Sequence, residues 1–72
     1  MVKFTKLSES ASKIIYEVFE CGDIFTVEYD KNTKKYIFFD ENGKEYNPTF
    51  AGCGFLHVIR NNFPDKYLYA FC

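Results

Sequence analysis

The sequence contains few of the side chains that carry chemistry. Its 72 residues include a single histidine and three widely separated cysteines. It has no CxxC or HxxxH pair and no GxSxG, phosphate-loop or GxGxxG pattern. We therefore expect a protein that is not an enzyme and that uses no cofactor.

An excess of charge and long apolar runs are also lacking. Nine basic and ten acidic side chains leave a net charge of −1, without the basic field that drives binding to phosphates. No apolar run approaches the roughly 20 residues of a membrane span, and the first residues lack the apolar core of a signal peptide. An odd number of cysteines fits free thiols in a reducing compartment. These features predict a soluble, cytoplasmic protein.

Aromatic side chains, by contrast, are abundant, with nine Phe and six Tyr. The chain is long enough for a single domain, residues 1–72, near the lower size limit for a core without crosslinks. We expect aromatic packing to supply the burial that metals or disulfides supply in other small domains.

The stretch from Asp23 to Asn47 predicts three antiparallel strands joined by two tight turns. Asn42-Gly43 is the strongest hairpin signal, because both residues tolerate the positive φ of a two-residue type I′ turn. The earlier connection is polar and fits a five-residue loop over residues 30–34. Each loop length fixes the register of the strands that it joins.

This register divides the side chains between two faces, because successive residues of a strand point to opposite sides. It pairs Tyr29 with Lys35, and Phe39 with both Phe25 and Tyr46. The face expected to form the core carries Phe25, Val27, Tyr29, Ile37, Phe39 and Tyr46. The other face would carry Ile24, Thr26, Glu28, Tyr36, Phe38 and Asn47. That second face is too aromatic for a solvated surface, so we expect the rest of the chain or a partner to cover it.

The N-terminal part favours an edge strand followed by a helix. Residues 2–6 alternate apolar and polar side chains, and their lysines suit an unpaired edge. A serine N-cap, apolar residues at helical spacing and Gly22 beyond the end predict an amphipathic helix over residues 9–20. The competing interpretation is a strand over residues 14–19, where β-branched and aromatic residues are dense, with a direct turn into the next strand.

The C-terminal third is less regular. Residues 55–62 fit a short helix or a strand, and the glycines at 52 and 54 disfavour a helix just before them. Residues 66–72 predict a strand that is apolar on both sides, as in the interior of a sheet or at an interface. The predicted fold class is therefore α+β: an antiparallel β-meander over residues 23–47, an N-terminal amphipathic helix packed on it, and a C-terminal strand.

Two further groups of residues have the side-chain types of binding sites. Four side chains of a type that ligates zinc are present, which is the number of a structural zinc site: Cys21, Cys53, His57 and Cys72. Scattered cysteines are mostly small buried hydrophobes, however, and we predict no metal site. Tyr36 and Phe38 lie beside Lys31, Lys34 and Lys35 at the adjoining turn and could stack the bases of single-stranded nucleic acid. The surrounding acids, Glu28, Asp30, Asp40 and Glu41, would repel phosphates.

The segments VKFTK, GDIFTVEYD and YIFFDENGKEYN resemble short uncharacterised proteins encoded by bacteriophages and prophages. Those proteins carry a Gly-Asp entry to an apolar strand and an aromatic FFDxxGxE hairpin, and the resemblance covers residues 2–6 and 22–47. Some are similar to small Src-homology-type barrels. The resemblance therefore implies, as an alternative fold, a small open all-β barrel with residues 7–22 as a loop. It brings no site residues with it.

For function we expect a non-enzymatic protein-binding module, such as a viral or mobile-element accessory protein that binds or inhibits a protein of the host cell. More apolar β surface than a short chain can bury points to protein contacts or self-association. The side chains expected to contact the partner are Tyr36, Phe38, Tyr67, Tyr69 and Phe71. The alternative function is binding of single-stranded nucleic acid.

Overall fold

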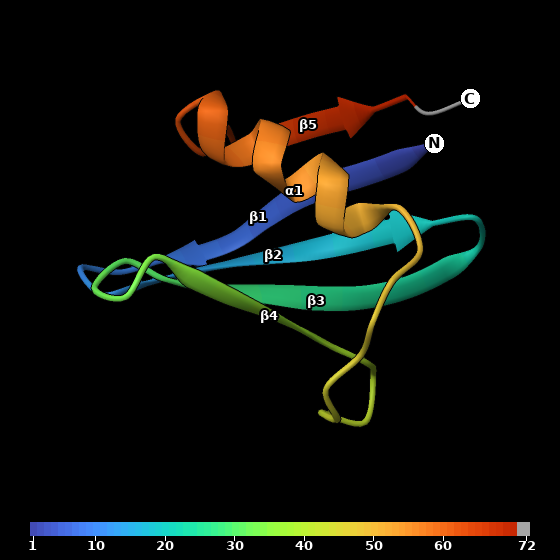
Figure 1. The fold of residues 1–72 in the computed structure, drawn as a ribbon, viewed down its shortest axis with the longest axis horizontal. Coiled ribbons are helices and arrows are strands. Elements are labelled where there is room, and N and C mark those ends of the chain that lie inside the picture. Colours follow the sequence, from blue (N-terminus) through green and yellow to red (C-terminus); the bar gives the residue numbers. More distant parts are fainter. Residues whose placement is uncertain (71–72) are drawn as a thin grey trace.

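The computed structural model describes residues 1–70 and shows one antiparallel sheet with a helix across one face (Figure 1). The elements in chain order are β1 (Val2–Glu9), β2 (Lys13–Glu20), β3 (Asp23–Asp30), β4 (Lys35–Phe39), α1 (Ala51–Arg60) and β5 (Lys66–Tyr69). The strand order is β4-β3-β2-β1-β5, so a four-stranded meander is extended by β5, which returns to pair with β1. The α+β class, the antiparallel meander and the C-terminal strand are confirmed.

The N-terminal helix predicted over residues 9–20 is wrong, because most of this segment forms β2. Ile14, Tyr16 and Val18 are fully buried on one side, and they alternate with more exposed neighbours. A period of two matches a strand that is covered on one face. The dense β-branched and aromatic residues therefore decide the structure here, as the competing strand interpretation stated.

A two-residue turn joins β2 to β3 where the helix prediction placed a helix end. Glu20 pairs with Asp23, which leaves Cys21 and Gly22 as the loop. Their φ angles are +49° and +90°, as a type I′ turn requires at both central positions. Gly22 thus belongs to the turn of a hairpin and does not terminate a helix.

The β3–β4 connection has four residues, one fewer than predicted. Asp30 pairs with Lys35, Tyr29 with Tyr36 and Val27 with Phe38. The Lys34 N–H donates to the Asp30 carbonyl at 2.8 Å, and Lys34 itself has a φ of +61°. Since a one-residue shift exchanges the two faces of a strand, Tyr36 and Phe38 point to the core. The core positions predicted for Ile37 and Phe39 are wrong.

The Asn42-Gly43 hairpin is present with a different loop. Gly43 N–H donates to the Asp40 carbonyl at 3.0 Å, and Asp40 N–H donates to the Lys44 carbonyl at 2.8 Å. Gly43 has a φ of +82°. This is the pattern of a three-residue loop whose last residue is left-handed. Phe39 consequently pairs with Glu45, and the predicted pairing with Tyr46 is wrong.

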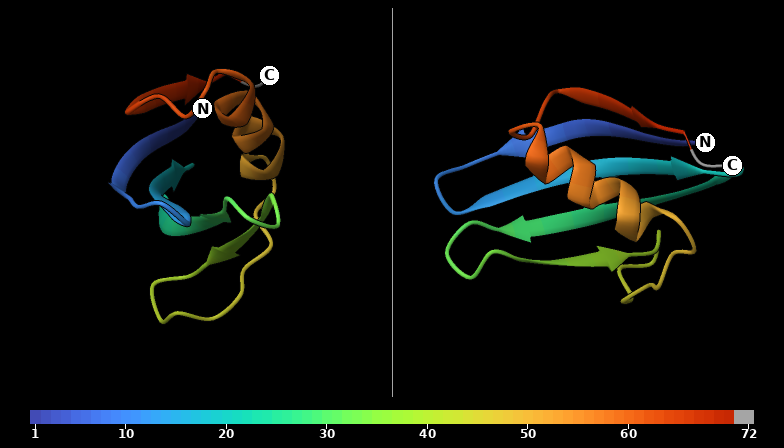
Figure 2. Two further views of the ribbon diagram at one scale, coloured as in Figure 1. Left: turned by 90° about the vertical axis from the view of Figure 1, so that its left-hand side faces the viewer. Right: turned by 45° about the horizontal axis from the view of Figure 1, so that its top comes forward.

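Helix α1 covers the core face of the sheet, as the end-on view in Figure 2 shows. Its buried residues Ala51, Phe55 and Val58 pack on the sheet. The open question at residues 55–62 is answered by a helix that begins before Gly52 and Gly54. A β-carbon on Gly54 would lie 3.0 Å from the rings of Phe4 and Tyr69, so this glycine permits the close approach of α1 to the sheet. The fully or nearly fully buried apolar residues are Val2, Phe4, Ile14, Tyr16, Val18, Phe25, Val27, Tyr29, Phe38, Ala51, Phe55 and Val58.

A carboxylate from the sheet caps α1. Glu20, at the end of β2, is 5% exposed, and its Oε1 accepts hydrogen bonds from Phe50 N at 3.0 Å and Ala51 N at 2.8 Å. The free amides of a helix start need acceptors, and a negative charge there is favourable. Glu20 thereby fixes the start of α1 against β2.

The edges of the sheet are β4 and β5. The prediction that residues 2–6 form an edge strand is wrong, because β1 lies between β2 and β5. Within residues 1–70 no rung joins β4 to β5, so the sheet is open and does not close into the barrel considered as an alternative. Residues 7–22, a loop in that barrel, belong largely to β1 and β2.

Candidate interaction surface

The structure places two of the predicted contact residues, Tyr36 and Phe38, beneath α1. Their ring centroids lie 4.9 and 6.3 Å from that of Phe55. Phe38 is 7% exposed and also packs against Phe25 at 5.9 Å. The two aromatic rings of the face that was expected to need a cover are therefore covered by the chain's own helix, whereas Ile24 of that predicted face lies on the opposite side of the sheet. A base-stacking platform at Tyr36 and Phe38 would require these rings to be exposed.

Tyr67 and Tyr69 lie on β5 and also face the core side. Both are partly buried and pack against the core cluster, and the ring of Tyr69 lies 5.0 Å from that of His57. Phe71, predicted as a contact residue, and Cys72 lie outside the described residues. The four predicted residues that the structure describes, Tyr36, Phe38, Tyr67 and Tyr69, therefore do not form one exposed patch.

The uncovered face of the sheet carries the exposed apolar residues instead. Cross-strand pairing puts Ile24, Phe19, Lys3 and Leu68 in one row over β3, β2, β1 and β5. Ile24 and Leu68 are 57% and 59% exposed, and Phe19 is 45% exposed. Ile37, 45% exposed, lies on the same face of β4 with the half-buried Phe39. We call this surface, formed by Phe19, Ile24, Ile37, Phe39 and Leu68, the open face.

Charges of both signs are interspersed on the open face. Glu17 pairs with Thr26 and Thr5 in the row next to Phe19. Lys13 Nζ lies 3.5 Å from Glu28 Oε1. The apolar side chains of the open face therefore stay accessible among charged neighbours.

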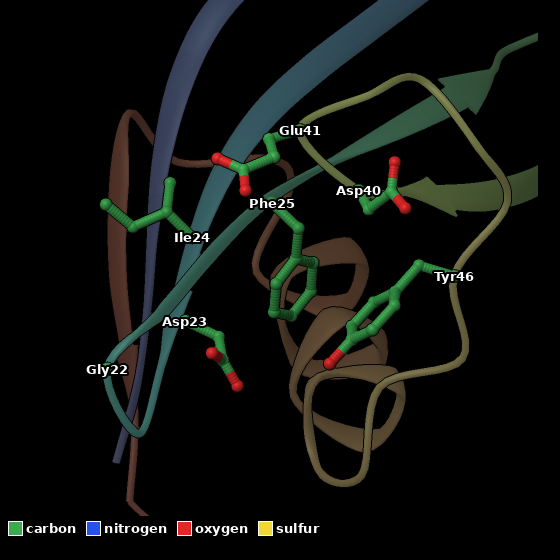
Figure 3. Close-up of a pocket in the computed structure, with 7 residues that line it drawn as sticks. All are labelled: Gly22, Asp23, Ile24, Phe25, Asp40, Glu41 and Tyr46. Atoms are coloured by element: carbon green, nitrogen blue, oxygen red, sulfur yellow. The ribbon is translucent and has the colours of Figure 1, made fainter.

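A hollow opens at the end of the sheet next to the open face, where β3 extends beyond the last residue of β4 (Figure 3). Its volume is about 330 Å³, and it is lined by Gly22, Asp23, Ile24, Phe25, Asp40, Glu41 and Tyr46. The rings of Phe25 and Tyr46 lie side by side with centroids 4.9 Å apart. We call this hollow the notch. Three carboxylates and no cationic side chain line it.

The carboxylates of the notch are not equivalent. Asp40 Oδ1 accepts hydrogen bonds at 2.9 Å from the N–H groups of Asn42 and Lys44, so it holds the hairpin loop in shape. Asp23 and Glu41 are exposed residues. Their carboxylates are therefore accessible to a positively charged ligand, whereas the Asp40 carboxylate also stabilises the hairpin loop.

The cysteines and the histidine do not converge in the part of the chain that is described. Cys21 lies in the β2–β3 turn, whereas Cys53 and His57 lie on α1. Both cysteines are exposed free thiols, and no group of three potential metal ligands occurs among residues 1–70. No helix within these residues is long and apolar enough to cross a membrane.

Comparison with known proteins identifies no relative. No family model, curated protein or solved structure matches the chain. The surface features of the molecule are therefore the basis for a functional hypothesis.

Sequence reasoning missed the open face because it placed Phe19 on a helix and exchanged the two faces of β4. The sequence contains these residues, but the face of the sheet on which Ile37 and Phe39 lie depends on whether the β3–β4 loop has four or five residues. The signal that could have found the shorter loop is Asp30, whose carboxylate Oδ1 accepts hydrogen bonds from Asn32 N at 2.8 Å and Thr33 N at 3.3 Å. An aspartate that begins such a turn favours a compact loop.

Proposed function

We propose that this protein is a non-enzymatic protein-binding module that contacts its partner through the open face. The observation that carries the proposal is the row of Ile24, Phe19 and Leu68, which are 45–59% exposed on the face that α1 leaves uncovered. Burying such side chains against a partner supplies about 25 cal/mol per Å² of apolar surface. The resemblance to phage-encoded proteins leads us to propose a host protein as that partner.

Two features of the molecule support this proposal over the nucleic-acid alternative. Tyr36 and Phe38 serve the core, so they offer no stacking platform. The net charge of −1 supplies little attraction to phosphates. The open face offers apolar contacts with scattered charges of both signs, a composition suited to a protein surface.

The test compares variants that place a charge on exposed apolar residues of the open face and of α1. Phe19→Lys and Leu68→Lys alter the open face, whereas Leu56→Lys alters a 44% exposed residue on α1. The protein and its variants, each immobilised at equal density, are incubated with nuclease-treated extract of the cells that produce the protein. We expect a retained protein to be lost with the open-face variants and kept with Leu56→Lys.

Urea unfolding of each variant provides the folding control for this test. Retention that is indifferent to Phe19→Lys and Leu68→Lys, with all variants folded, would contradict the open face as the contact surface. A species that is retained from untreated extract but not from nuclease-treated extract would indicate nucleic acid in place of a protein.

A further inference from the structure

We infer that the notch binds an extended peptide segment of alternating basic and apolar residues, which adds as a short strand to the free edge of β3. This inference rests on the proposed function and names the chemistry of one segment of the partner. It is built on three observations: the unequal lengths of β3 and β4, the direction of the main-chain groups at Ile24, and the carboxylates of the notch.

The first observation is that β3 extends past its neighbour. Strand β3 begins at Asp23, but its pairing with β4 begins only at Thr26, opposite Phe39. Beyond Phe39 the chain turns away into the hairpin loop, and its return segment reaches the outer side of β4, where Tyr46 N–H donates to the Phe38 carbonyl at 2.8 Å. The track that β4 would follow beside residues 23–25 is therefore vacant in the described part of the chain.

The second observation is the direction of the main-chain groups along this track. In an antiparallel pair, successive residues point their N–H and C=O groups to alternate sides. Because the Phe38 carbonyl points outward to Tyr46, the groups of Phe39 point inward to Thr26. By the same alternation, Ile24 points its N–H and C=O toward the vacant track. An incoming residue opposite Ile24 would form one complete rung, as in other cases of strand addition to a sheet edge.

The third observation is the charge and shape around this rung. A residue paired with Ile24 would place its side chain on the open face, next to an exposed apolar side chain. Its two neighbours would point to the other side, toward Asp23 and the Tyr46 ring. A lysine or arginine there would meet uncompensated carboxylates, with its apolar stem along the aromatic ring. The preferred pattern is therefore basic, apolar, basic.

The size of the notch limits how much of the segment it holds. A volume of about 330 Å³ lies at the lower end of the range for ligand pockets, roughly 300–1,000 Å³. This suits a few residues and excludes a folded domain. The notch and the open face meet at Ile24, so one partner can occupy both, with its extended segment in the notch.

The experiment uses a capped heptapeptide that alternates lysine and valine, titrated into the isotopically labelled protein at low salt and followed by amide NMR. We expect the largest shifts at residues 22–26 and 40–46. The exposed Ile24 amide should exchange rapidly with solvent when free and at least about tenfold more slowly at saturation, because strand addition gives its N–H an acceptor.

Two control peptides separate strand addition from charge attraction. A glutamate-valine heptapeptide should bind at least about tenfold more weakly. A lysine-valine peptide N-methylated at its valines keeps its charge, but it lacks the N–H groups that would face β3 and its methyl groups block close approach to the edge, so it should leave the exchange rate of the Ile24 amide unchanged. Equal binding of the glutamate peptide, or shifts centred elsewhere, would overturn the inference.

Matched variants test the residues and separate this inference from the proposed function. The neutralised pair Asp23→Asn with Glu41→Gln should weaken binding of the lysine peptide about fivefold or more, whereas Glu17→Gln on the open face should leave it unchanged. Asp40 is left intact, because it shapes the loop. If the notch variants bind the lysine peptide as well as the natural protein does, while Phe19→Lys still abolishes partner retention, the notch alone is refuted. Loss of partner retention through the notch variants with no effect of Phe19→Lys would refute the open face.

Discussion

The α-carbon of Gly54 faces the ring of Phe4 so closely that an added β-carbon would lie 3.0 Å from its Cε2. Phe4 is fully buried between the sheet and α1 and has little room to move. We expect Gly54→Ala to lower the free energy of unfolding by about 1–3 kcal/mol, the usual cost of overpacking.

The matched control is Gly52, two residues earlier on the same helix. A β-carbon at Gly52 would meet nothing within 4 Å, so Gly52→Ala should raise the stability by about 0.5–1 kcal/mol through helix propensity. Urea unfolding followed by circular dichroism measures both. Equal effects of the two substitutions would show that α1 does not lie as close to β1 as described.

The capping of α1 by Glu20 gives a second prediction. Glu20→Ala removes the acceptor of the Phe50 and Ala51 amides at a buried site and should cost about 1–3 kcal/mol. Glu20→Gln keeps an acceptor without the charge and should cost less. The control Glu17→Ala, on the exposed side of the same strand, should change the stability by less than about 0.5 kcal/mol. The measurement is again urea unfolding, with the helical signal recorded to see whether α1 frays.

Tyr16 gives a prediction about pH. Its hydroxyl donates to the Pro64 carbonyl, and burial, together with the nearby Glu9 and Asp65 carboxylates, raises the pKa of Tyr16 to about 12 from 10.0. The folded state thus holds this proton more tightly than the unfolded chain does. Its contribution to stability is full below about pH 10 and decreases as the pH rises from about 10 to about 12.

The substitution Tyr16→Phe separates this effect from the titration of the other tyrosines. It should cost about 0.5–1.5 kcal/mol at neutral pH, because the Pro64 carbonyl loses its donor. It should also reduce the loss of stability that the natural protein shows above about pH 10. Phenolate absorbance during alkaline titration provides an independent measurement. If Tyr16→Phe and the natural protein lose equal stability in alkali, the hydroxyl is not buried as described.

The β2–β3 turn predicts a stabilising substitution. Cys21 has a φ of +49°, a conformation that asparagine tolerates better than other residues with a β-carbon. Cys21→Asn should raise the free energy of unfolding by about 0.5–1 kcal/mol, and Cys21→Val should lower it by about 1 kcal/mol or more. Thermal unfolding at equal protein concentration measures the order Asn, Cys, Val. A stabilising valine would contradict the type I′ turn.

Sequence alone predicted an antiparallel meander over residues 23–47 and the terminal strand, because apolar alternation and turn residues act locally; β3 and β4 form there, with a different register. It failed where two local patterns competed. Residues 14–19 satisfy helical spacing and strand propensity together, and only burial of Ile14, Tyr16 and Val18 beneath α1 selects the strand. The glycines of α1 likewise oppose a helix by propensity, and the requirement for Gly54 comes from Phe4 and Tyr69, which are distant in sequence.

For Tyr36 and Phe38, the prediction of an exposed surface failed through the register of β4. Lys34 adopts a positive φ, which no property of lysine favours, and this shortens the loop by one residue. The difference of one residue puts Tyr36 and Phe38 on the core face and Ile37 and Phe39 on the opposite face, the reverse of the prediction. The β3 residues Phe25, Val27 and Tyr29 were assigned to the correct face, whereas the residues of β4 were assigned to the wrong faces.

The pairing of β1 with β5 also determines how the molecule responds to mechanical force. Val2 pairs with Tyr69, and the pairing runs inward from there to Thr5 and Lys66. Force applied to residues 1 and 70 therefore acts at the same end of an antiparallel pair, so it opens the rungs one after another instead of shearing them together. We expect the first event in single-molecule pulling to be detachment of β5 at low force.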